Sequence, residues 1–127
     1  MKMLTSKRGF TLLELLMVII VVGILASLAI PQYQNFVERS RCTEAVNMIA
    51  AIKSAQALYE LQEGETAGAI ADLSDFISVV DTTNWAFTTT NATITATKQV
   101  IPNNNNTITW TMANRSWSGT HPNAPSN

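Results

Sequence analysis

The feature that most constrains this chain is an apolar stretch over residues 10–30, in which Glu14 is the one charged side chain. Fourteen of its 21 residues are Leu, Ile, Val or Phe. As a helix the stretch would be about 31 Å long, close to the roughly 30 Å hydrocarbon core of a bilayer. Transfer of these apolar side chains outweighs the roughly 3 kcal/mol that one acidic residue costs. We therefore expect residues 10–30 to form a membrane-inserting helix.

Basic residues flank this stretch on one side only. Lys2, Lys7 and Arg8 precede it, and no further base occurs until Arg39. Because short basic flanks stay on the cytoplasmic side, we expect the N-terminus in the cytoplasm and residues 31–127 across the membrane. The net charge of −1 argues against a general nucleic-acid binder. It does not decide whether the protein binds DNA in a more specific way.

The motifs of common enzymes and metal sites are missing from the sequence. Its one cysteine, Cys42, excludes a disulfide within the chain and a cysteine-based zinc site. Its one histidine, His121, leaves no histidine cluster for a metal. There is no phosphate-binding loop, dinucleotide fingerprint, nucleophile elbow or zinc-protease motif. We therefore expect no enzyme, no cofactor and no metal site.

A cleaved secretory signal is the alternative for the N-terminal region, and it would release a soluble binding domain. Ser27, Leu28 and Ala29 fit a small-x-small cleavage site. Against it, the apolar run exceeds the usual ~7–15 residues of a signal, and a discarded segment has no use for Glu14. An ionisable residue within a membrane span is by default a functional residue. A plain signal anchor leaves Glu14 equally unexplained.

The run from Lys7 to Glu14, KRGFTLLE, resembles the processing site of type IV prepilins and of the related pseudopilins of type II secretion. Pro31 matches a proline of that family, and the close resemblance covers about residues 1–60. It implies that a prepilin peptidase cuts between Gly9 and Phe10 and methylates the new N-terminus. It also implies storage in the inner membrane, an assembly platform there, and polymerisation with other copies of the chain.

The spacing between Phe10 and Glu14 has a physical reading of its own. Cleavage before Phe10 would free an α-amino group within about one helical turn of the carboxylate. An isolated carboxylate in hydrocarbon is costly, whereas one paired with an ammonium can stay charged. We expect Glu14 to pair with the amine of a neighbouring subunit, which would fix the axial register. Pairing within one chain is the alternative, because residues four apart also lie within reach on a helix.

Two residues weaken the apolar helix at its far end. Pro31 removes one helix hydrogen bond and crowds the carbonyl of Ser27, so a kink is expected there. Gly23 also lowers helix propensity. We hypothesise that residues 23–31 stretch or unwind when subunits pack.

The sequence as a whole predicts an α+β fold. We expect the chain to divide into a leader (1–9), a core helix (10–30), an amphipathic helix (31–62), a connecting region (63–84) and a sheet with a tail (85–127). The second helix should end before Gly64. Residues 71–77 are expected to form a short helix or turn. Strands are expected at residues 85–90, 93–101 and 107–112, because β-branched residues alternate there; a fourth near 116–117 would complete an antiparallel meander. The apolar helix stripe is Ala45, Met48, Ile49, Ile52, Ala55 and Tyr59.

One face of this sheet should cover the helix stripe, through Ile94, Ala96, Ile108 and Trp110. Turns are expected at Asn91 and at residues 103–106. The tail from Gly119 is expected to be loose, and Cys42 to be packed rather than reactive.

Two departures from the family pattern bear on function. Many pilins close the C-terminal region with a disulfide, for which this chain lacks a second cysteine. Many pseudopilins bind calcium in a C-terminal loop, but no Asp or Glu follows Asp81. We therefore expect a pilin: a structural subunit of a type IV pilus-like filament for adhesion, motility or DNA uptake, with a type II secretion pseudopilin, and hence a periplasmic pseudopilus, as the alternative.

Overall fold

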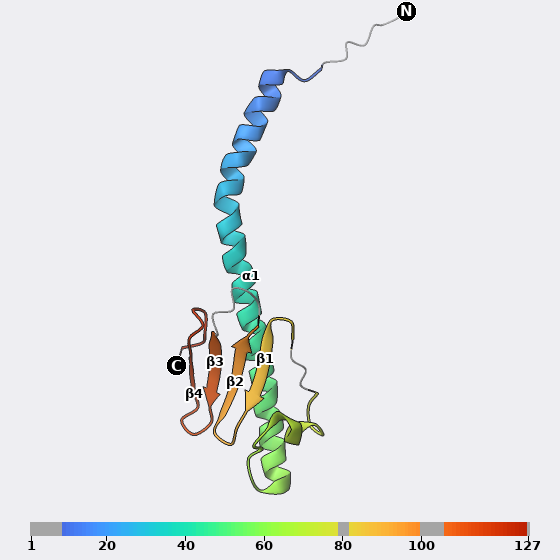
Figure 1. The fold of residues 1–127 in the computed structure, drawn as a ribbon, viewed down its shortest axis with the longest axis vertical. Coiled ribbons are helices and arrows are strands. Elements are labelled where there is room, and N and C mark those ends of the chain that lie inside the picture. Colours follow the sequence, from blue (N-terminus) through green and yellow to red (C-terminus); the bar gives the residue numbers. More distant parts are fainter. Residues whose placement is uncertain (1–8, 79–81, 100–105, 127) are drawn as a thin grey trace, which may run out of the picture. The chain divides into compact units, whose positions relative to one another are not determined.

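The computed structural model describes residues 9–78, 82–99 and 106–126 of the chain, drawn in colour in Figure 1. Its elements are a long helix α1 (Leu12–Glu63), a short 3₁₀ helix η1 (Ile70–Leu73) and four strands, β1 (Trp85–Thr89), β2 (Thr93–Lys98), β3 (Thr107–Thr111) and β4 (Ser116–Gly119). The predicted α+β class is confirmed. The chain forms two compact units, one ending at Val37 and the other beginning at Glu38, and each is described by itself.

Helix α1 ends where the sequence predicts. Gly64 follows its last residue with φ of +80°, and the Gly64 N–H donates to the carbonyl of Glu60 at 2.9 Å. Glycine is favoured at this position because it adopts the left-handed conformation without steric cost. Pro31 lies inside α1 and does not end it. Stretching of residues 23–31 on assembly stays a prediction, since it concerns packed subunits.

The sheet is an antiparallel meander in the order β1-β2-β3-β4. Alternation of side chains decides its inner face: Ile94 and Ala96 on β2 are fully buried, and Ile94 lies opposite Trp110 on β3. The predicted fourth strand near residues 116–117 is confirmed as β4, which pairs with β3. The predicted strand end at residues 100–101 and most of the predicted 103–106 turn lie outside the described residues.

The core of the second unit lies between this sheet and the C-terminal half of α1. Ala45, Ile49, Ile52 and Ala55 are buried along one helix face, and Met48 and Tyr59 are half-buried beside them. Ile94, Ala96, Ile108 and Trp110 cover that face, as predicted. Cys42 is buried at the end of the helix stripe, so its predicted packing is confirmed.

The buried side-chain amide of Gln56 joins the loop before η1 to α1. Gln56 donates from Nε2 to the Ala67 carbonyl at 3.1 Å and accepts from the Ala67 N–H at 3.0 Å. The same Nε2 donates to Thr89 Oγ1 on β1 at 2.9 Å. After this loop comes η1, within the region expected to hold a short helix or turn, and it buries Leu73 in the core.

The prediction of a loose tail is wrong. Thr120 accepts from the Thr107 N–H at 3.0 Å, and the ring of His121 is fully buried against α1. The Asn123 carbonyl accepts from the Cys42 thiol at 2.9 Å. Prolines and small polar residues suggested an unpacked end, but a buried histidine with a partner on the helix fixes these residues.

Candidate functional site

Thr11 sets the start of α1 and thereby the geometry of the segment that carries the predicted site. Its hydroxyl accepts from the backbone N–H of Glu14 at 3.1 Å, and its carbonyl accepts from the N–H of Leu15 at 3.2 Å. Threonine with glutamate three residues later is the pattern of a helix-capping box. This role of Thr11 was not among the predictions from the sequence, although the spacing of Thr11 and Glu14 is a local sequence signal for it.

This cap leaves Gly9 and Phe10 outside the helix. Both residues are exposed and lack regular secondary structure, with the Phe10 side chain 84% exposed. A Cβ added at Gly9 would meet no atom within 4 Å. The fold of this chain therefore does not require glycine at position 9, and any requirement must come from a partner that binds the segment. Lys2, Lys7 and Arg8 lie outside the described residues.

Glu14 lies in the first turn of α1 with an exposed side chain. Among the described residues its carboxylate forms no ion pair. In the uncut chain the nitrogen of Phe10 is a peptide nitrogen, so the predicted amine partner does not yet exist. The helix N-terminus favours an acidic side chain at this position, but it leaves the carboxylate oxygens open to a stronger partner.

The predicted site residues fall into two groups along the chain. Gly9, Phe10 and Glu14 lie within six consecutive residues around the start of α1. Gly23 and Pro31 follow Glu14 by two or more turns of that helix. A Cβ at Gly23 would also meet nothing within 4 Å. Close packing at Gly23 is therefore not a need of the isolated chain.

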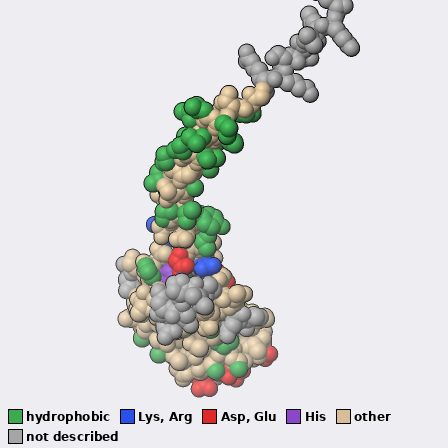
Figure 2. Space-filling view, turned by 45° about the horizontal axis from the view of Figure 1, so that its top comes forward, with side chains coloured by type: hydrophobic (Ala, Val, Ile, Leu, Met, Phe, Trp, Pro, Cys, Tyr) green, Lys and Arg blue, Asp and Glu red, His purple; other side chains and the backbone are tan. Residues whose placement is uncertain are grey.

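The first unit presents an extended apolar surface in which Glu14 is the one charged side chain between residues 10 and 30. Every large apolar side chain from Phe10 to Ile30 is at least 50% exposed, and Figure 2 shows hydrophobic side chains along the visible face of this helix. Among the described residues this is one helix that is long and apolar enough to cross a membrane. A surface of this kind requires burial in lipid or against other apolar helices.

Comparison with known proteins shows that this chain is similar to fimbrial proteins and to a type IV major pilin protein. The family described as the prokaryotic N-terminal methylation motif matches residues 4–30. A fimbrial protein of Neisseria meningitidis is 35% identical over 105 residues, covering 76% of this chain and 62% of the relative. The type IV major pilin protein PilE1 of Neisseria gonorrhoeae is 37% identical over 96 residues, covering 68% of this chain and 58% of the relative.

A fimbrial protein of Pseudomonas aeruginosa is 48% identical over 50 residues, which cover 39% of this chain and 32% of that protein. The chain thus spans about three-fifths of the length of the Neisseria relatives and a third of the Pseudomonas one. Similarity is higher over the shorter match than over the longer ones.

Proposed function

From the match to the prokaryotic N-terminal methylation motif and the similarity to fimbrial proteins and a type IV major pilin, we propose that this chain is a member of the type IV pilin family. As such it would be a structural subunit that polymerises into a type IV pilus-like filament. The observation that carries the proposal is the apolar surface of residues 10–30, exposed on an isolated helix whose start carries the methylation motif. In the filament these helices would bury one another. The work of the protein is then assembly, and no catalytic step is assigned to it.

We propose that maturation precedes assembly. A prepilin peptidase would cut between Gly9 and Phe10 and methylate the new amine, which keeps its positive charge. Two observations support this site: both residues are exposed and non-helical, and position 9 has no need of glycine within the fold. A protease cleft that closes around extended backbone would require glycine at this position, because glycine lets the backbone approach closely.

Before assembly, residues 10–30 would lie in the inner membrane with the leader in the cytoplasm. An assembly platform in that membrane would then transfer the helix from lipid to the fibre. The exchange has a low cost in apolar burial, because lipid chains and neighbouring helices are similarly apolar. The fibre would extend to the cell surface.

Glu14 is proposed to set the register between subunits. Its carboxylate would bind the methylated amine of Phe10 on a neighbouring copy, so both charges would be neutralised in the apolar core. Removal of one partner from such a buried pair costs roughly 3–5 kcal/mol, which is more than a hundredfold in an association constant. Pairing within one chain would give no such dependence of assembly on Glu14.

The experiment combines N-terminal sequencing of the mature chain with a fibre-shearing assay. Mature protein should begin at methylated Phe10, and Glu14→Gln should insert in the membrane while yielding at least about a hundredfold less fibre. Glu60→Gln is the matched control, because Glu60 is an exposed carboxylate on the same helix outside the apolar segment; it should assemble normally. Normal fibres from Glu14→Gln would refute the pairing.

A mature chain that begins near Ile30 would instead identify an exported soluble domain. Methylated protein confined to the periplasm, with no surface fibres by electron microscopy, would favour the secretion pseudopilin.

A further inference from the structure

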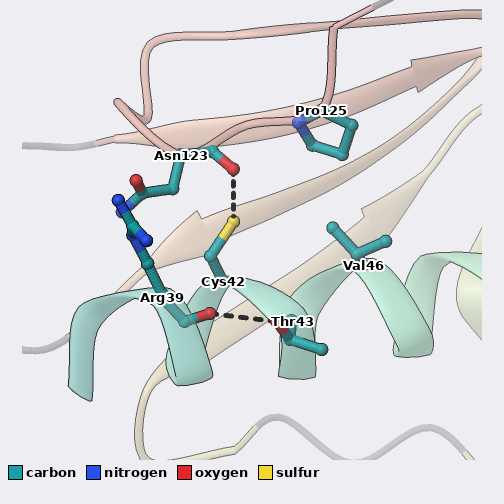
Figure 3. Close-up of a pocket in the computed structure, with 6 residues that line it drawn as sticks. All are labelled: Arg39, Cys42, Thr43, Val46, Asn123 and Pro125. Atoms are coloured by element: carbon teal, nitrogen blue, oxygen red, sulfur yellow. Dashed lines mark hydrogen bonds between the residues drawn. The ribbon is translucent and has the colours of Figure 1, made fainter. Parts of the chain in front are cut away.

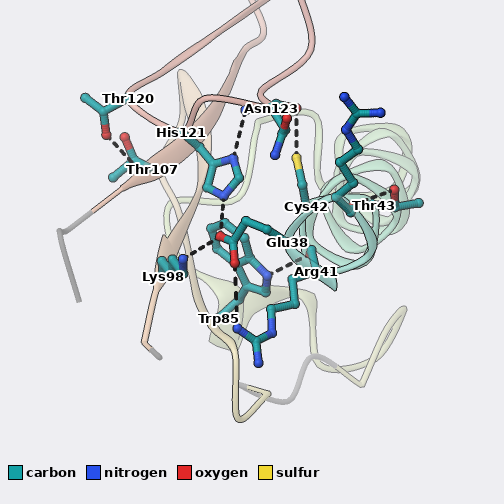
Figure 4. Close-up of polar contacts among 11 residues, drawn as sticks. Glu38, Arg41, Cys42, Thr43, Trp85, Lys98, Thr107, Thr120, His121 and Asn123 are labelled. Carbon is teal, nitrogen blue, oxygen red and sulfur yellow. Dashed lines mark hydrogen bonds and ion pairs between the residues drawn. The ribbon is translucent and has the colours of Figure 1, made fainter. Parts of the chain in front are cut away.

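A buried histidine joins the C-terminal tail to α1. The ring of His121 is fully buried, and its Nε2 lies 3.0 Å from Glu38 Oε1. Its Nδ1 accepts from the backbone N–H of Asn123 at 3.1 Å. The ring also packs against Trp85, with 5.4 Å between the ring centroids. Figure 4 shows the imidazole between the helix residue and the tail residue that it bonds.

These partners assign the protonation state of the ring. A backbone N–H is always a donor, so the Nδ1 that faces Asn123 must be unprotonated. The proton of a neutral imidazole then lies on Nε2, from which it is donated to the Glu38 carboxylate. The arrangement therefore fits neutral His121 and no other form.

The charged groups around the ring come from two elements. Helix α1 contributes Glu38 and Arg41, and β2 contributes Lys98. The neutral thiol of Cys42, also on α1, donates to the tail at Asn123. Lys98 donates to the same Glu38 oxygen as His121, and Arg41 Nη1 lies 3.6 Å from the other. Burial opposes ionisation of Glu38, but hydrogen bonds from Lys98 and His121 outweigh it and hold the pKa of that carboxyl below 4.5.

A second proton on His121 would break one of its two bonds. The only open ring position is Nδ1, and a proton there would point at the Asn123 N–H, setting donor against donor. Glu38 already has Lys98 and Arg41 as cationic partners, so it does not need a third.

The bond between the Asn123 N–H and His121 Nδ1 fixes the position of several tail residues. The Asn123 carbonyl accepts from the Cys42 thiol, and the Ala124 N–H donates to the His121 carbonyl at 3.0 Å. Residues 121–124 thus form one turn whose attachment to α1 depends on the orientation of the imidazole. A pocket of about 460 Å³ lies beside it; Figure 3 shows its lining, with Asn123 and Pro125 on the tail facing Arg39, Cys42, Thr43 and Val46 on α1.

We propose that the tail is an acid-released latch: protonation of His121 detaches residues 122–126 from α1, which opens this pocket and exposes the thiol of Cys42. All groups involved lie in the second unit, so the latch works in a single subunit as well as in a fibre. It goes beyond the proposed function and does not depend on it.

The test measures protection of Cys42 in the full-length chain in detergent micelles. The chain has one cysteine and one histidine, so the thiol and imidazole signals are each unique. Dithiodipyridine is added at about pH 7.5 and about pH 5.5, on either side of the ordinary histidine range. Each rate is divided by that of the urea-unfolded chain at the same pH, which removes the intrinsic pH dependence of the thiol.

Protection should fall on acidification, by at most about tenfold per pH unit, the limit for one linked proton. The midpoint should coincide with that of the His121 ring signals in an NMR titration. The variant His121→Gln keeps a neutral donor toward Glu38 and cannot be protonated, so its protection should be equal at both pH values.

Two results would overturn the latch. One is equal protection of the wild-type thiol at both pH values; the other is the same loss of protection in His121→Gln, which would assign the effect to Glu38 or to general acid loosening. If His121→Gln does not fold, the wild-type midpoints decide. Coincident midpoints support the latch, and separate midpoints contradict it.

Discussion

Replacement of Gln56 by leucine should destabilise the second unit more than its change in side-chain volume suggests. The substitution leaves both the N–H and the carbonyl of Ala67 without their buried partner. Thr89 Oγ1 loses less, because it also lies 3.3 Å from the Thr93 carbonyl. Each buried polar group left unpaired costs roughly 1–3 kcal/mol.

Two such groups give an expected loss of about 2–6 kcal/mol. For a unit of this size that corresponds to a fall in Tm of roughly 10 °C or more. Thermal unfolding of the full-length chain in detergent, followed by the fluorescence of the buried tryptophans, measures this fall.

Gln62→Leu is the matched control. Gln62 is exposed on the same helix, and within the described part of the chain its side chain donates to the neighbouring Glu63 at 3.3 Å. Its replacement should change the free energy of unfolding by less than about 0.5 kcal/mol. If Gln56→Leu costs no more than Gln62→Leu, the reasoning about buried unpaired groups at Ala67 is incorrect.

Two further substitutions test other parts of the second unit by the same unfolding assay. Gly119→Ala would place a Cβ 2.1 Å from the Thr107 carbonyl oxygen, at a φ of +147°, and should cost about 3 kcal/mol or more. In the control Gly68→Ala the Cβ would lie 3.1 Å from the Asn91 side chain and 3.9 Å from that of Asp72, so this change should cost far less. Equal losses of stability in the two variants would contradict the clash at position 119. Glu38→Gln should cost roughly 1–3 kcal/mol near neutral pH and flatten the acid dependence of stability. Because the pKa of Glu38 lies below 4.5, its ionised form contributes stability above that pH, and the contribution is lost as the pH falls through the folded-state pKa; an unchanged pH profile in Glu38→Gln would show that the carboxylate contributes nothing.

The processing segment was predictable because its signals are local. Gly9, Phe10 and Glu14 lie within six consecutive residues, and the Thr11 cap could have been found by the same inspection. The structure adds a negative observation that no sequence pattern contains. Neither Gly9 nor Gly23 is needed as glycine for packing within the described chain, so their roles must be sought in partners.

The sequence alone determined the membrane-length helix, the apolar stripe that follows it and the alternation of the strands, because each is a periodic pattern read over neighbouring residues. Only the tertiary structure decided that the tail is docked and that Glu38, Lys98 and His121 meet. Glu38 and His121 are 83 residues apart, and Glu38 and Lys98 are 60 apart. No local periodicity encodes such contacts; they exist because the sheet packs on the helix stripe and brings distant polar side chains to one end of the core.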